Sequence, residues 1–207
     1  MLKSFKRIIL LFVCLFIVGA HCQDVQIIDG GSLTSKNGSE YYWDMYLLPL
    51  RVHIDSSLSP EIKGIIKAAA QRWEDEIGFD VFEIYEVSPT SKEILGFPVG
   101  GVISVSRTQL GMADWSDSAI NGMAEISLFK DDLGGIEGRI YGVNMWLDID
   151  LLVHRIYDTA VHEFGHCLSL AHDTNDPSSI MFPSSERNID ADIKKEDILR
   201  IRLKAFR

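Results

Sequence analysis

Three histidines in the second half of the chain have the spacing of metal ligands. His162 and His166 are four residues apart, and His172 follows six residues later. On a helix, residues four apart project from one face, so both imidazoles can reach the same ion. The chain must turn after Leu170 to bring His172 back as a third ligand. Three neutral imidazoles that leave a fourth position open are typical of a catalytic zinc site rather than a structural one.

Glu163 directly follows the first of these histidines. It lies about 100° from His162 around a helix, so it flanks the ligands without being one of them. A carboxylate in that position is suited to accept and return a proton. We therefore interpret Glu163 as the general base and acid of the site.

A helix over residues 151–170 is expected to carry these groups. Its apolar residues lie on the side opposite His162 and His166, which predicts one face in the core and the other facing a cleft. These apolar residues are Val153, Ile156, Ala160, Phe164 and Cys167. We interpret Cys167 as a small buried residue rather than a ligand or redox group.

The rest of the chain alternates between strand and helix patterns. Ser59, Pro60 and Glu61 have the residue types of a helix start, and Gly78 is expected to end that helix. The final stretch, 193–206, is predicted to be helical. Strands are expected at 47–54, 79–87, 99–105, 123–129 and 139–147. This order predicts an α+β fold with a twisted mixed sheet and helices packed against it.

In the segment that holds these histidines, the chain resembles the metzincin clan of zinc endopeptidases. Its signature, HExxHxxGxxH, is followed by a turn that bears a methionine. Met181 stands nine residues after His172, within the sequence Ser-Ile-Met-Phe-Pro, and this turn is similar to that of the matrixins (the matrix metalloproteinase family). The resemblance extends over about residues 41–207. It implies a minimal catalytic domain of bacterial type, with a five-stranded sheet, a long active-site helix and two further helices.

The resemblance implies a function and several residue roles. Zn²⁺ held by the three histidines and Glu163 as base would hydrolyse peptide bonds of protein substrates. Met181 would form an apolar floor under the imidazoles. Substrate would pair with an edge strand near 123–129, and Asp158 would line the pocket for the residue after the scissile bond. Two alternatives stay open: a zinc-binding recognition module that has lost turnover, and a secreted or tethered interaction protein without metal.

The chain departs from the matrixin pattern in ways that affect the site. Ser169 replaces the signature glycine, and a positive φ there costs a non-glycine residue about 1 kcal/mol. We expect this turn to be strained or built differently. A second zinc is not expected, because no histidine lies between His53 and His154. Asp131, Asp132 and carbonyls at 134–138 form either a Ca²⁺ site or a solvated acidic loop.

Residues 1–20 have the pattern of an export signal. Lys3, Lys6 and Arg7 precede an apolar run at 8–18, which predicts a secreted, surface-located or periplasmic protein. Residues 21–40 are expected to form an extension or short pro-segment, followed by the catalytic domain at 41–207.

Three residues in the extension carry open hypotheses. In some small bacterial relatives an aspartate caps the zinc, and Asp24 or Asp29 is a candidate for that role. Cys22 leaves lipid attachment open as an alternative, although His21 stands where such sites usually have a small residue.

Composition excludes several classes of function. The 207 residues are 46% hydrophobic, which suits one globular domain, and the formal net charge of −10 disfavours binding to nucleic acid. No stretch after the signal is long and apolar enough to span a membrane. Three cysteines cannot form a disulfide framework.

Overall fold

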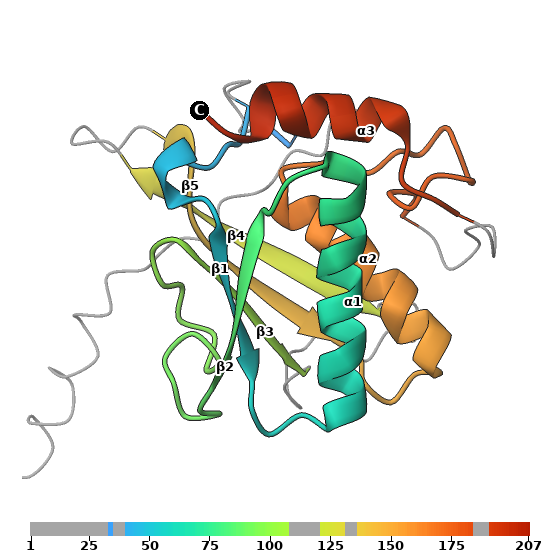
Figure 1. Cartoon of the computed structure of the whole chain (residues 1–207). Coiled ribbons are helices and arrows are strands. Elements are labelled where there is room, and N and C mark those ends of the chain that lie inside the picture. Colours follow the sequence, from blue (N-terminus) through green and yellow to red (C-terminus); the bar gives the residue numbers. More distant parts are fainter. Residues whose placement is uncertain (1–32, 35–39, 108–120, 131–135, 184–190) are drawn as a thin grey trace, which may run out of the picture.

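A computed structural model of the chain describes residues 33–34, 40–107, 121–130, 136–183 and 191–207 (Figure 1). The hypotheses on the export signal, Cys22, Asp24 and Asp29 lie outside these residues. The same holds for Asp131 and Asp132, so the calcium hypothesis stays a prediction. Among the described residues, no helix has the length and apolar character needed to cross a membrane.

Five strands form one mixed sheet. They are β1 (Leu50–Asp55), β2 (Phe82–Val87), β3 (Val102–Arg107), β4 (Gly122–Lys130) and β5 (Ile136–Leu147), in the order β2-β1-β3-β5-β4. β1 pairs in parallel with β2 and β3, and β3 pairs in parallel with β5. β4 pairs antiparallel with β5 and lies at the sheet edge, where the edge strand was predicted.

Two long helices, α1 (Pro60–Ile77) and α2 (Val153–Cys167), pack side by side on one face of the sheet (Figure 1). The Ser59 hydroxyl accepts the Ile62 N–H at the start of α1, and Gly78 ends it with a φ of 86°. The third helix, α3 (Lys195–Arg200), continues as a π-helical turn, η3 (Ile201–Ala205). The predicted α+β class, five-stranded sheet and three helices are confirmed.

β1, β2 and β3 each begin three residues later than the sequence pattern predicted, and a local contact precedes the first two. Residues Met45–Leu47 form a 3₁₀ turn, η2, in which the Leu48 N–H donates to the Met45 carbonyl, so β1 starts only at Leu50. At the start of β2, the Glu74 carboxylate accepts hydrogen bonds from the N–H groups of Val81 and Phe82, at 2.8 Å each. This side chain draws the chain toward α1 before β2 begins.

The hydrophobic core lies between the sheet and the two long helices. Trp73 of α1 and Phe164 of α2 are fully buried there. The Trp73 indole N–H donates to the Val161 carbonyl at 2.8 Å, and the Trp43 indole N–H donates to the Cys167 carbonyl at 2.8 Å. These bonds satisfy buried polar groups and fix α2 on both sides. The helix that carries the histidines is therefore held by the core.

Candidate active site

Three imidazole nitrogens converge at the end of α2. The Nε2 atom of His166 lies 3.1 Å from the Nε2 atom of His162 and 3.1 Å from that of His172. Their ligand atoms all lie within 4.8 Å of one another. Ligand nitrogens of a tetrahedral zinc ion are about 3.3 Å apart, given zinc–nitrogen bonds of about 2.0–2.1 Å. The triad predicted from the sequence therefore has the spacing of a zinc site.

Backbone carbonyls set the tautomer of two of these histidines. The Nδ1 atom of His162 lies 2.7 Å from the Ile180 carbonyl oxygen, and that of His166 lies 2.8 Å from the Leu170 carbonyl oxygen. A carbonyl only accepts, so each Nδ1 carries the hydrogen and each neutral ring has its lone pair on Nε2. Two such lone pairs facing each other cannot hydrogen-bond. The donor set therefore fits a cation, with carbonyls orienting the ligands.

The turn after α2 has the left-handed geometry that the sequence made doubtful. Ser169 has a φ of 70°. The Leu170 N–H donates to the Gly165 carbonyl and the Ser169 N–H donates to the His166 carbonyl, a pattern that ends many helices with a left-handed residue. The turn thus has the backbone conformation that a glycine adopts easily, and Ser169 adopts it at an energetic cost. It still brings His172 to the other two histidines.

The turn that bears Met181 packs against α2 at Gly165. Met181 is fully buried, and its sulfur approaches Gly165 so closely that a Cβ atom on this glycine would overlap it. The same added atom would lie 3.0 Å from Cζ2 of Trp73. The absence of a side chain at Gly165 lets the turn and α1 both reach the helix between His162 and His166.

The Glu163 side chain projects from α2 and is buried against the edge strand β4. It is 5% exposed, as is His162, whereas His166 and His172 are partly exposed. A Cβ atom on Gly122, the first residue of β4, would lie 3.0 Å from Oε1 of Glu163 and 2.5 Å from Cγ2 of Thr159. Gly122 therefore lets the edge strand approach the predicted base. Sequence analysis missed this residue, because a lone glycine does not reveal which neighbour requires it.

The other predicted residues of α2 are placed as follows. Ile156, Ala160, Phe164 and Cys167 are buried as predicted, and burial raises the pKa of the Cys167 thiol well above its usual value, which suits an unreactive core residue. Val153 was predicted to be in the core but is 50% exposed, because it is the first residue of α2, next to exposed Leu152. Asp158 is partly buried, one turn before His162. Its role in a substrate pocket stays a prediction.

A residue ahead of the predicted domain boundary also contacts the site. The N–H of Leu33 donates to the Ser169 carbonyl at 2.8 Å, and the Leu33 side chain is buried. Sequence analysis assigned this residue to the extension at 21–40. No motif marks it, since the contact is made by its backbone.

One comparison with known proteins covers the segment that contains the site. Residues 149–203 match the sequence model of the family described as Matrixin. This segment contains the three histidines, Glu163 and Met181. Among solved structures, the chain is similar to one described as "Structure of Myroilysin", at 14% identity, with a TM-score of 0.37, over 73% of this chain and 77% of that one. No curated protein matched the sequence.

Proposed function

We propose that this chain, which carries a matrixin-like metallopeptidase domain, is a secreted zinc-dependent endopeptidase. The observation that carries the proposal is the convergence of the Nε2 atoms of His162, His166 and His172. The Matrixin match over the same residues supports it. The export signal expected in residues 1–20 supports the secreted location.

The chain's own residues divide the work of hydrolysis. His162, His166 and His172 would hold the ion, and the Ile180 and Leu170 carbonyls keep two of the rings in the ligating tautomer. When bound, zinc supplies Lewis acidity, which makes water a better nucleophile near neutral pH and polarises the scissile carbonyl. The Glu163 carboxylate accepts the proton of the attacking water and then delivers it to the leaving amine.

The edge strand β4 is the proposed docking site for an extended substrate. Among the strands that the structure describes, β4 pairs with β5 on one side and is last in the order of the sheet, so an extended peptide would pair with its other edge. Gly122 brings the start of this strand beside Glu163. A peptide added to β4 would therefore run past the base. Asp158, on α2, is the proposed side chain for selecting the residue after the scissile bond.

The test is cleavage of an unfolded protein by the zinc-loaded chain, with Glu163→Ala and Glu163→Gln prepared identically. We expect cleavage by the unmodified chain and a loss of at least about 10³-fold in both variants, because a positioned base and charge stabilisation are removed together. Each preparation is assayed for bound zinc. If all three bind about one zinc per chain and none cleaves, the chain is a zinc-binding recognition module. If the variants cleave as fast as the unmodified chain, Glu163 is not the base.

A further inference from the structure

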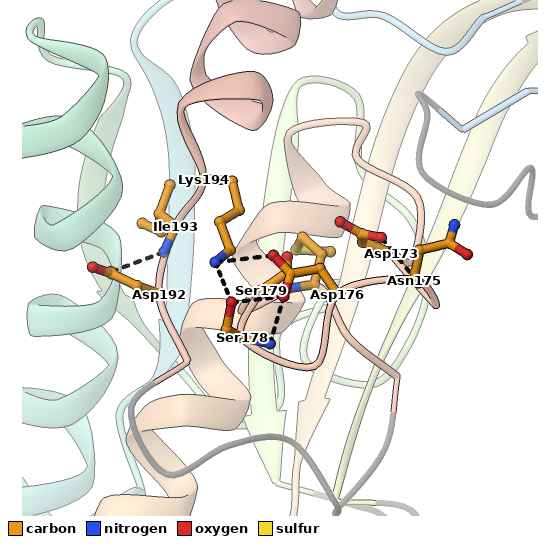
Figure 2. A network of polar contacts seen from close by, with 9 residues as sticks. Asp173, Asn175, Asp176, Ser178, Ser179, Asp192, Ile193 and Lys194 are labelled. Carbon is orange, nitrogen blue, oxygen red and sulfur yellow. Dashed lines mark hydrogen bonds and ion pairs between the residues drawn. The ribbon is translucent and has the colours of Figure 1, made fainter.

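A polar cluster joins the loop after His172 to the start of α3 (Figure 2). The Lys194 ammonium lies 3.0 Å from Oδ2 of Asp176 and donates to the Ser178 hydroxyl at 2.5 Å. Oδ1 of Asp176 accepts both the hydroxyl and the N–H of Ser178, at 2.6 and 2.9 Å. Three side chains thus close a ring of charged and polar contacts, which we call the Lys194 clamp (Asp176, Ser178 and Lys194).

The clamp lies beside a short backbone pairing that leads to the metal site. The Asp192 N–H donates to the Ser178 carbonyl at 2.9 Å, and the Ile180 N–H donates to the Asp192 carbonyl at 2.8 Å. The carbonyl of Ile180 is the group that orients His162. Lys194 therefore holds Ser178 beside the backbone pairing of residues 178–180 with Asp192. The Ile180 carbonyl, which orients His162, belongs to the same paired segment.

The clamp differs from an ordinary surface ion pair. Isolated exposed pairs contribute little or nothing to stability, because two long side chains must be ordered for a single contact. Lys194 has two partners, its side chain is only 27% exposed, and it is the residue just before α3, so its backbone is already ordered. The pKa of Asp176 is lowered to about 2, first by the hydrogen bonds from Ser178 and then by that from Lys194, so these contacts favour the charged form of the carboxylate.

We propose that Lys194 is a positioning residue of the metal site, acting through Ser178 and the Ile180 carbonyl on His162. This inference rests on the proposed zinc function. A residue that orients a ligand through one hydrogen bond typically changes metal affinity about 10–100-fold when it is removed. Lys194 acts one step further away. We therefore expect Lys194→Met to weaken zinc binding by about three- to tenfold.

The test is the zinc dissociation constant of the full chain, measured by competition with a chromophoric chelator. Lys194→Met is compared with Lys194→Arg, which keeps the charge and the hydrogen bonding, and with Lys63→Met. Lys63 is the matched control, because its 2.7 Å pair with Glu86 is similarly buried on the lysine side but joins α1 to β2. We expect weaker zinc binding only in Lys194→Met, with Lys194→Arg within about twofold of the unmodified chain.

Asp176→Asn provides a second route if Lys194→Met fails to fold, and we expect it to weaken zinc binding in the same direction. Equal affinity in the unmodified chain and in every folded clamp variant would overturn the inference and leave the proposed function standing. Equal weakening in Lys63→Met would also overturn it, because the effect would then be one of overall charge. No zinc binding by the unmodified chain would overturn the inference together with the proposed function.

Discussion

Gly165 and Met181 touch in a way that leaves no room for a side chain on the glycine. The Met181 sulfur occupies the space of a Cβ atom at this position, and Cζ2 of Trp73 closes it from α1. The signature His-Glu-x-x-His thus has a packing requirement at its fourth residue as well as a chemical one. The methionine turn reaches the underside of the ligand helix only because position 165 is a glycine.

Gly165→Ala is expected to lower the free energy of unfolding by about 1–3 kcal/mol, the usual cost of overpacking a well-packed core. The matched control is Gly64→Ala at an exposed position of α1, where nothing lies within 4 Å of the added atom. That change is expected to raise stability by about 0.5–1 kcal/mol, because alanine is the better helix former. Urea unfolding of the zinc-free chain measures both. A Gly165→Ala chain as stable as the unmodified one would contradict the packing described.

Ser169→Gly is expected to stabilise the chain by about 1 kcal/mol, because glycine adopts a positive φ without strain. Ser169 is also buried, and within the described residues its hydroxyl has no hydrogen-bond partner. Gly78→Ala is the mirror control. Gly78 has a φ of 86° at the end of α1, and we expect Gly78→Ala to lower the free energy of unfolding by about 1 kcal/mol. Urea midpoints give both signs, and a less stable Ser169→Gly chain would show that the serine is not strained.

Gly122→Ala is expected to reduce kcat/KM by about tenfold to a hundredfold, because displacement of a catalytic group by about 1 Å has effects of this size. The added methyl would meet Cγ2 of Thr159 at 2.5 Å and Oε1 of Glu163 at 3.0 Å. Thr159→Ser removes the closer of these atoms, so the double variant should recover part of the loss. Zinc content should stay unchanged throughout. No change in kcat/KM in Gly122→Ala would show that β4 does not position Glu163.

The Lys194 clamp also predicts a pH dependence. Asp176 has a pKa of about 2 in the folded chain against an ordinary 3.8, so the unfolded chain binds this proton more readily. Its contribution to stability is therefore complete above about pH 5 and is lost as the pH falls from about 4 toward 2. The urea midpoint of the zinc-free chain should exceed that of Asp176→Asn at pH 6, and the difference should shrink by pH 3. A difference that is constant down to pH 3 would contradict the assignment.

Local sequence patterns were enough to predict the elements of the fold and the three histidines whose ligand atoms converge. Helical spacing placed His162 and His166 on one face, and the need for a turn placed His172 beside them. The prediction that Val153 is buried was wrong, because periodicity cannot tell the first residue of a helix from its interior. β1 and β2 started late because a 3₁₀ turn and the Glu74 carboxylate, which periodicity does not report, direct the chain before each strand.

The supporting contacts of the site could not be predicted in this way. Two of the three converging histidines are oriented by the carbonyls of Ile180 and Leu170, and every residue has a carbonyl, so no residue type signals this role. Gly122 and Lys194 act through neighbours distant in the sequence, at Glu163 and Asp176. Ser169 was recognised as a departure, but only the structure shows that it keeps the left-handed turn.

The most direct test of the central claim is a zinc titration of activity. Zinc is removed from the full chain with a chelator and added back in small steps, while cleavage of an unfolded protein and bound zinc are both measured. The account predicts that cleavage is lost with the metal and rises in proportion to bound zinc until about one ion per chain, the number that one three-histidine site holds. Cleavage that persists without metal, or one bound zinc without any cleavage, would contradict it.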